Sequence, residues 1–366
     1  MELINATRML AGYTMGLEPS GRELLVIAIK GTFRLPEDGK PVLLHEEQVP
    51  LVMADVFTGQ PGFSAPLYEV DYAPRKPCCD VLLNGSAYAP AGKRANRVQV
   101  GLRVGSLVKQ FNVVGDRMWE VSRGRTRATP PQAFESMPIS YDVAFGGVDT
   151  SHEDPAKHAA CLRNPVGRGF IANASHSSFD GKPLPNTEEI DRPVERGDGQ
   201  YQPMSFGPIG RNWEPRLRYA GTYDQHWLDN VFPFLPADFD DQYYQAAPAD
   251  QQLRVPIGSP EVVLGNLTPD GVRRFTLPNF EAPVHVFAKR GEREDLKATL
   301  DTILIEPDKE RLTLTWRVAR PLAKNMHEVA QVLVGKKGRE WWQQREEVAF
   351  PIPVVMVPVE RAPETA

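Results

Sequence analysis

Strict alternation of apolar with polar or small residues is the feature that most limits what this chain can fold into. In the clearest stretch the apolar positions are Val98, Val100, Leu102 and Val104. The dipeptide Gly105-Ser106 follows, and apolar residues then return at Leu107, Phe111 and Val113. Because successive side chains of a strand point to opposite faces, this pattern predicts a β-hairpin with one buried face.

A second alternating stretch lies near the C-terminal end, within 301–319. Its apolar positions are Leu312, Leu314, Trp316 and Val318. The dipeptide Pro307-Asp308 precedes them and is a turn signal, so a second hairpin is predicted. The run 23–35 is continuously apolar, rich in β-branched and aromatic residues, and ends at a proline, which predicts a buried strand. Asn84-Gly85 favours a tight turn, because both residue types tolerate positive φ.

Composition agrees with a fold made of many strands and turns. The chain has 34 prolines and 29 glycines, together 63 of its 366 residues. This share exceeds the roughly 12% of average proteins and argues against a helical bundle. We therefore expect a mainly β protein: an antiparallel, strand-rich scaffold of one or two packed β-sandwich-like units with little helix.

Three parts can be distinguished along the chain. Residues 1–120 and 259–366 are predicted as β-rich units, and 121–258 as an irregular segment rich in Pro, Gly and aromatic residues that packs on the sheets. The sequence leaves open whether the two β-rich ends form one sandwich or two domains. Residues 336–348 fit a short helix or a loop, and the proline-flanked run 351–359 is predicted as a final strand at a sheet edge.

Charge and targeting features exclude several classes of protein. The net charge is −5, and the 42 basic residues form no stripe, so nucleic acid is not an expected partner. No run approaches the ~20 apolar residues of a membrane span, and the start lacks a signal-peptide pattern. We expect a cytoplasmic protein that has no contact with membrane. Of the three cysteines two are adjacent, and no disulfide framework is expected.

The motifs that could carry chemistry fail their spacing tests. In "HEDPAKH" the histidines His152 and His158 are six apart around a proline, whereas a zinc-protease helix needs them four apart. In "DFDD", counting from Asp238, the sixth and twelfth positions lack the Gly and Glu of a calcium loop. An irregular calcium site remains the less favoured alternative to turn caps and surface acids. The glycine-rich "FGG" and "GRGF" match no phosphate loop and are interpreted as backbone bends. We expect no catalytic residue, metal or cofactor.

Aromatic residues concentrate in the irregular segment, where nine lie between positions 213 and 244. They are Trp213, Tyr219, Tyr223, Trp227, Phe232, Phe234, Phe239, Tyr243 and Tyr244. In one interpretation these rings pack the segment onto the β core. In the other, some form a recognition surface for a protein or a sugar, oriented by Arg216 and Asp224. Both interpretations can hold for different rings.

The order of motifs over about residues 5–320 resembles one bacterial family. The motifs are "AIKGTF" (28–33), "DYAPRKPCCDVLLNGSAYAP" (71–90), "VVGDRMW" (113–119), "MPISYDVAFGG" (137–147), "NPVGRGF" (164–170), "PRLRYAGTYDQHW" (215–227), "FPFLPADFDDQYYQAAPADQQ" (232–252) and "LDTILIEPDKERLTLTWR" (300–317). The chain is similar to domain of unknown function 2169, whose genes lie in type VI secretion clusters beside VgrG spike proteins and toxins with PAAR-like tips.

This resemblance implies an adaptor or chaperone without catalytic activity. Such a protein would bind an effector or its PAAR-like domain in the cytoplasm and help to load it onto VgrG. The positions expected to bind the partner are Trp213, Arg216, Tyr223, Asp224, Trp227, Phe234, Asp238, Tyr243, Trp341 and Trp342. Two other classes stay open: a carbohydrate-binding or glycan-active protein, which would show a cleft with coplanar exposed rings, and a structural component secreted with the spike.

Overall fold

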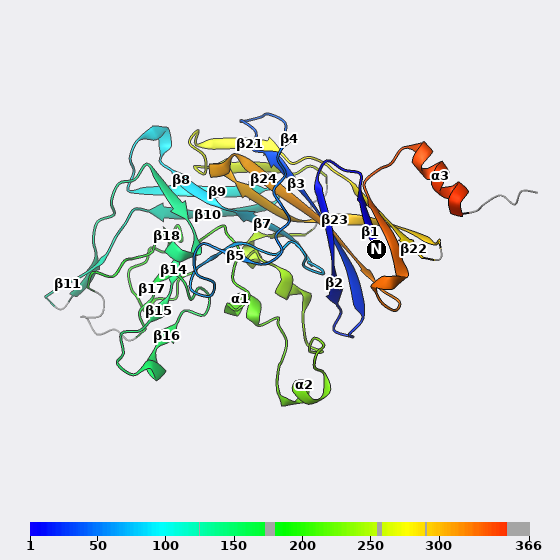
Figure 1. Cartoon of the computed structure of the whole chain (residues 1–366). Coiled ribbons are helices and arrows are strands. Elements are labelled where there is room, and N and C mark those ends of the chain that lie inside the picture. Colours follow the sequence, from blue (N-terminus) through cyan, green and yellow to red (C-terminus); the bar gives the residue numbers. More distant parts are fainter. Residues whose placement is uncertain (124, 173–179, 255–257, 290, 350–366) are drawn as a thin grey trace, which may run out of the picture.

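The computed structural model describes residues 1–123, 125–172, 180–254, 258–289 and 291–349. This part of the chain is mainly β, with two large sheets surrounded by short strands and short helices (Figure 1). No helix within these ranges is long and apolar enough to cross a membrane. The prediction of a strand-rich scaffold with little helix is therefore confirmed.

The larger sheet has 10 strands, along the path β1-β25-β22-β23-β24-β3-β2 with β4, β7 and β19 joined at its side. It curves so far that its end strands β1 and β2 come close together (Figure 1). The strands are β1 (Glu2–Asn5), β2 (Leu10–Leu17), β3 (Glu23–Arg34), β4 (Leu43–Leu44), β7 (Cys79–Leu83), β19 (Gln252–Leu253), β22 (Ala282–Ala288), β23 (Arg293–Glu306), β24 (Arg311–Pro321) and β25 (Val329–Val334).

The smaller sheet has five strands and packs against the larger one. Its order is β18-β10-β9-β20-β21, and its strands are β9 (Arg97–Val104), β10 (Leu107–Val114), β18 (Thr187–Glu188), β20 (Glu261–Gly265) and β21 (Val272–Thr276). Leu102 and Phe111 of this sheet share one buried cluster with Ile27, Ile303 and Leu314 of the larger sheet. The two sheets thus enclose a single main core.

The strongest sequence patterns are confirmed as strands. The apolar run became β3, in which ten consecutive residues are buried. The first alternating stretch became the β9–β10 hairpin, where Val104 pairs with Leu107 across the Gly-Ser turn. The second became β23 and β24, in which Leu312 pairs with Ile305.

The expected turn at Asn84-Gly85 is wrong. β7 ends at Leu83 and β8 (Gly85–Tyr88) begins one residue later, yet the two strands do not pair with each other. β7 pairs with β23 and β19, whereas β8 pairs with β13 (Ser136–Ile139). The side chain of Asn84 donates a hydrogen bond to the carbonyl of Leu67 at 2.8 Å, which fixes it as a link between two sheets.

Strands from both predicted β-rich parts pair with one another. β24 lies between β23 and β3, and β9 lies between β10 and β20. Each large sheet therefore combines strands from before residue 120 and after residue 259. The boundaries at these positions mark a change in composition, and neither of the two large sheets is confined to one side of them.

The described residues of 121–258 form short elements, as expected for a stretch without sustained period. These include β12 (Arg125–Ala128), β13, β14 (Phe145–Gly146), β15 (Val148–Asp149), β16 (Ala159–Ala160), β17 (Arg168–Gly169), α1 (Glu214–Leu217) and α2 (Gln225–Asn230). β11 (Trp119–Ser122) leads into this segment, and β5 (Val56–Phe57) and β6 (Pro66–Tyr68) form a separate small hairpin.

The two glycine-rich motifs, which the sequence predicts to be backbone bends, form two short strands that lie side by side. β14 pairs with β17, so that Gly146 faces Gly169. A Cβ at Gly146 would lie 2.1 Å from the carbonyl oxygen of Asn164, and its φ of 153° also favours glycine. The motifs therefore serve a close approach of two backbones.

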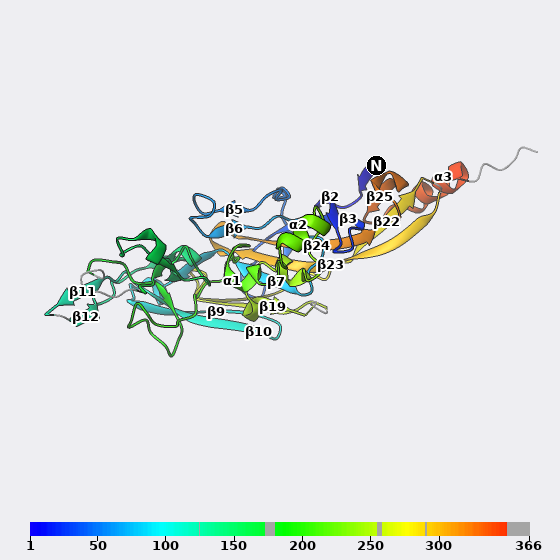
Figure 2. The ribbon, with the colours of Figure 1, turned by 90° about the horizontal axis from the view of Figure 1, so that it is seen from below.

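The region 336–348 proves to be helical, since α3 spans Arg339–Ala349. α3 lies at one end of the elongated molecule, and β11 lies at the other (Figures 1 and 2). The predicted final strand at 351–359 falls outside the described residues.

Candidate protein-interaction site

A loop that projects from the body of the molecule carries exposed aromatic side chains. It comprises residues 221–236, with α2 at its tip, and we call it the aromatic protrusion (Figure 1). Ala220, which directly precedes the protrusion, and Pro236, its last residue, are both buried. The protrusion therefore leaves the body and returns to it at almost the same place.

The neck of the protrusion is closed by local hydrogen bonds. The backbone N–H and the hydroxyl of Thr222 donate to the two carboxylate oxygens of Asp238, at 3.0 and 2.7 Å. Gly221 has a φ of 82°, and a Cβ there would lie 2.9 Å from Pro236. The chain needs glycine at this point because the two backbone segments of the neck approach so closely.

The helix at the tip begins at a side-chain cap. Asp224 accepts a hydrogen bond from the backbone N–H of Trp227 at 2.9 Å, as an N-cap residue does. Asp238 and the neighbouring Asp240 also bind backbone N–H groups, Asp240 that of Gln242 at 2.8 Å. Asp238 and Asp240 of the "DFDD" motif are therefore turn and helix caps, whereas Asp241 pairs with Arg75 at 3.2 Å.

Trp227 is the centre of the exposed ring cluster. Its ring lies edge-to-face against Tyr223 at 4.8 Å and against Phe232 at 5.6 Å between centroids. Its indole N–H donates to the carbonyl of Phe234 at 2.9 Å, which ties the two arms of the loop together. Trp227 itself is half-buried, and its neighbours form the outer surface of the tip.

The apolar surface of the protrusion is large for so short a segment. Its exposed side chains are Tyr223 (52% exposed), Leu228 (54%), Phe232 (62%) and Phe234 (44%). Exposed apolar groups that cluster in this way mark interaction surfaces, whereas isolated exposed apolar residues are common and do not indicate a function. Aromatic side chains in particular contribute much contact area at low entropic cost.

Further rings join the base of the protrusion to the body. Phe239, Tyr243 and Tyr244 contact one another with centroid distances of 5.4–6.1 Å. The guanidinium of Arg216 lies 5.7 Å from the ring centroid of Tyr243 and donates to the carbonyl of Tyr243 at 2.8 Å. These contacts hold the start and the end of the aromatic segment against each other.

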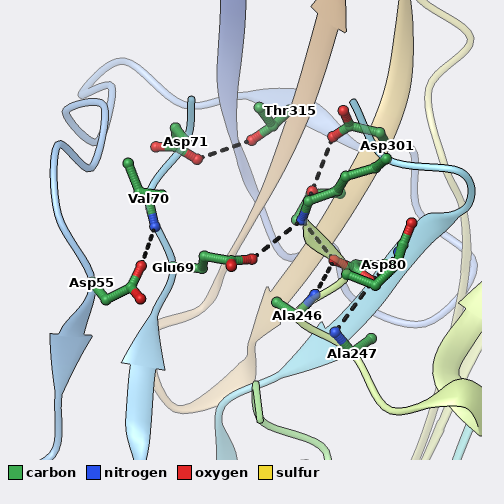
Figure 3. A network of polar contacts seen from close by, with 12 residues as sticks. Asp55, Glu69, Val70, Asp71, Asp80, Ala246, Ala247, Asp301 and Thr315 are labelled. Carbon is green, nitrogen blue, oxygen red and sulfur yellow. Dashed lines mark hydrogen bonds and ion pairs between the residues drawn. The ribbon is translucent and has the colours of Figure 1, made fainter. Parts of the chain in front are cut away.

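A buried ionic network continues from this base into the larger sheet (Figure 3). The carboxylate of Glu69 forms ion pairs with Arg216 at 2.6 Å, Arg211 at 2.8 Å and Lys76 at 3.4 Å. Burial alone raises the pKa of Glu69, but the three cations outweigh this effect and lower the pKa to about 2. Arg211 also binds Asp55 at 2.6 Å.

Asp80, inside the buried strand β7, connects the network to the segment that follows the protrusion. It binds Lys76 at 2.6 Å and accepts hydrogen bonds from the side chain of Gln245 and the backbone N–H groups of Ala246 and Ala247, at 2.6–3.2 Å (Figure 3). A fully buried carboxylate is tolerated only with such partners. Burial lowers the pKa of Lys76, but Asp80 and Glu69 outweigh this effect and raise it.

The network ends in two further pairs beneath the sheet. Arg317 pairs with Asp301 and donates to the carbonyl of Asp71 at 2.6 Å, and Asp71 pairs with Lys30 at 2.8 Å. Burial raises the pKa of Asp301. The positive charge of Arg317 lowers that pKa, but by less than burial raises it. A cavity of about 30 Å³ lies among these groups, which is room for roughly one water molecule.

This geometry gives the network a positioning role. Each of its carboxylates lies against a cation or backbone N–H groups, and the cavity of about 30 Å³ among them is too small for a substrate, although Lys76, Asp301 and Arg317 also line an open pocket of about 520 Å³. Among the described residues, no group of three or more His, Cys, Asp or Glu side chains could hold a metal ion. The network fixes the base on which the protrusion stands.

The predicted partner-binding residues fall into three places. Tyr223, Asp224, Trp227 and Phe234 lie in the protrusion, and Asp238 lies at its neck. Tyr243 lies at its base, half-buried. Arg216 also lies at the base, and the other three predicted residues lie elsewhere. The predicted set left out two of the most exposed positions, Leu228 and Phe232. Leu228 and Phe232 differ from the neighbouring residues in their solvent exposure, and the sequence pattern does not indicate that exposure.

Trp213 and Arg216 require a correction from contact residues to anchoring residues. They are 2% and 3% exposed, so a partner cannot reach them in this conformation. Trp213 packs edge-to-face on Tyr141 at 5.3 Å, and Arg216 binds Glu69. Both residues hold the segment onto the core, which is the packing interpretation of the aromatic segment.

Trp341 and Trp342 lie on α3, well away from the protrusion (Figure 1). Both are half-buried and pack on Phe287 of β22, at centroid distances of 6.4 and 6.1 Å. Arg293 lies over the ring of Trp342 at 5.0 Å. The structure therefore does not bring these two residues into the same surface as the protrusion.

Comparison with known proteins gives one result. The family described as "Uncharacterized protein conserved in bacteria (DUF2169)" matches residues 20–317. The chain belongs to the DUF2169 family. No curated protein and no solved structure matches this member. The DUF2169 match covers both large sheets in most of their extent, the whole protrusion and the whole ionic network, and it ends before α3.

Proposed function

We propose that this DUF2169 protein is a non-catalytic adaptor that binds another polypeptide through the aromatic protrusion. The observation that carries the proposal is the exposed ring cluster of Tyr223, Trp227 and Phe232 on a loop with a fixed neck. Interface hot spots are enriched in Trp and Tyr and are most effective on a surface that is already ordered.

The rigid base supports the same conclusion. A loop that binds a partner loses less conformational entropy when its neck and base are held before binding. Asp238 holds the neck, and the contacts of Arg216 and Asp80 hold the base. The protrusion thus projects from the body on an attachment that hydrogen bonds and ion pairs hold in place.

The geometry of the rings disfavours the carbohydrate alternative. A sugar-binding platform needs coplanar exposed rings, whereas Trp227 stands at 71° to Tyr223 and at 89° to Phe232. Edge-to-face rings offer an uneven apolar knob, which fits a hydrophobic pocket or groove of a protein. We therefore favour a protein partner.

For the identity of the partner we propose a type VI secretion effector, or its PAAR-like domain, which the adaptor holds in the cytoplasm and loads onto VgrG. This part of the proposal rests on the motif resemblance alone. It predicts that a gene for such a partner lies beside the gene for this chain.

Co-expression with the products of the neighbouring genes tests the proposal. The expected result is a stable complex with an effector or PAAR-like protein, weakened at least tenfold by Trp227→Ala and by Phe232→Ser. Trp342→Ala, a tryptophan change far from the protrusion, is the matched control and leaves binding unchanged. A melting scan of each variant separates lost contacts from lost folding.

Two results overturn the proposal. One is that no neighbouring gene product binds the wild-type chain, and secretion of the effector is unchanged when the adaptor gene is deleted. The other is that the protrusion variants, with unchanged melting midpoints, bind as tightly as the wild type. In the second case the binding surface lies elsewhere on the molecule.

A further inference from the structure

β2 is a long edge strand whose outer side has no partner among the described residues. It ends the larger sheet and pairs with β3 alone, over all eight residues from Leu10 to Leu17 and without a bulge. Backbone N–H and C=O groups on such an edge are a template for another strand.

The register shows which residues of β2 offer these groups. The N–H of Glu18 donates to the carbonyl of Arg22 at 2.9 Å, so the even-numbered residues of β2 bond to β3. The N–H and C=O groups of Tyr13, Met15 and Leu17 therefore point away from the sheet. No backbone or side-chain hydrogen bond to them exists within the described part of the chain.

The same three residues present exposed apolar side chains. Tyr13 is 39%, Met15 55% and Leu17 37% exposed. Because they alternate along the strand, they form one row on one face. The opposite face of β2 is covered, since a Cβ at Gly12 would lie 2.1 Å from the hydroxyl oxygen of Tyr72 and one at Gly16 3.2 Å from Pro74.

The other end strands of the two large sheets are protected in the usual ways. β1 has four residues, and β4, β18 and β19 have two each. β21 is longer but carries two arginines, and residues 38 and 39 cover it: Asp38 accepts from the N–H of Arg274 at 2.6 Å, and Gly39 donates to its carbonyl at 2.8 Å. Natural proteins place charges, prolines or coverings on edges to prevent pairing.

β2 has none of these protections. The stretch "MLAGYTMGL" (9–17) contains no charged residue and no proline. In antiparallel pairing about a twofold axis, a charged residue near the axis would lie close to the same charge on the second copy, and this strand contains no charged residue. Its neutrality and its alternating apolar row suit pairing with itself.

We infer that two copies of this chain associate through β2, in antiparallel pairing about a twofold axis. The outward-facing residues permit a register in which Met15 meets Met15 of the second copy and Tyr13 meets Leu17. This register forms about six new backbone hydrogen bonds and places the apolar side chains in cross-strand pairs. The inference is independent of the adaptor function and concerns a different surface.

Sedimentation equilibrium of the full chain, between about 1 and 100 µM, tests this pairing. The wild type is expected to approach twice the monomer mass of 40.8 kDa as concentration rises. Met15→Lys and Met15→Glu each place like charges opposite one another at the axis and are expected to weaken the dimer at least tenfold. An equimolar mixture of the two variants is expected to restore it.

Val108→Lys is the matched control, since Val108 is 56% exposed on strand β10 of the other sheet. It is expected to leave the dimer intact. A wild type that stays at 40.8 kDa throughout overturns the inference, as does a dimer that both Met15 variants leave unchanged. Monomeric variants that fail to recover in the mixture while their melting midpoints match the wild type overturn the pairing of Met15 with its copy.

Discussion

Arg216 and Glu69, which are 147 residues apart in the chain, form a buried ion pair of 2.6 Å at the base of the aromatic protrusion. Arg216 lies near the start of the aromatic segment and Glu69 precedes β7, so the pair joins the irregular middle of the chain to the strand framework. The same carboxylate also contacts Arg211 and Lys76, which have second partners in Asp55 and Asp80.

Glu69→Gln is expected to lower the free energy of unfolding by about 3–5 kcal/mol, because it leaves the buried guanidinium of Arg216 without its counter-charge. Urea denaturation measures this change. Glu281→Gln is the control, since Glu281 pairs with Lys297 at 2.9 Å on the exposed surface, and it is expected to leave the urea midpoint unchanged. Equal midpoints for Glu69→Gln and wild type would show that the network does not stabilise the fold.

The pH dependence of stability follows from the same carboxylate. The unfolded chain takes up a proton at Glu69 near pH 4.5, whereas the folded chain keeps the carboxylate until the pKa of about 2. The stabilisation is therefore complete above about pH 4.5 and is lost as the pH falls towards 2. Urea denaturation at several pH values in this window should show a steeper loss for wild type than for Glu69→Gln. Parallel curves would contradict the assignment.

Asp238→Ala is expected to open the neck of the protrusion while the sheets remain folded. The change removes both hydrogen bonds to Thr222, and the loop then samples more conformations. Limited chymotrypsin digestion should cut faster within 221–236, with the thermal midpoint of the body unchanged. Asp229→Ala, which removes only a hydrogen bond to Gln225 within the tip, is the control and should be cut at the wild-type rate.

Gly115→Ala is expected to destabilise the protein by about 1–3 kcal/mol, because the added Cβ would lie 1.7 Å from the carbonyl oxygen of Gln132. That oxygen belongs to the backbone and cannot swing aside as a flexible side chain does. The thermal midpoint measures the effect. Gly338→Ala, with no atom within 4 Å of its Cβ, should leave the midpoint in place. A wild-type midpoint for Gly115→Ala would mean that the segment around Gln132 moves freely.

The strands with the strongest residue patterns were determined by the sequence alone, because their signal is local. Alternation over Arg97–Val114 and Arg311–Pro321, and the apolar run of β3, each depend on neighbouring residues only. The irregular character of 121–258 followed for the same reason, from its lack of a sustained period. The sequence also singled out the aromatic stretch that contains the protrusion.

Which rings face solvent was decided only by the tertiary structure. Trp213 and Trp227 stand 14 positions apart in the same stretch, yet one is buried against Tyr141 and the other lies in the exposed cluster. The pairing of Glu69 with Arg216 and of Asp80 with Ala246 likewise joins residues far apart in the chain. Burial and ion pairing depend on contacts between distant segments, and a local pattern of residue types does not specify those contacts.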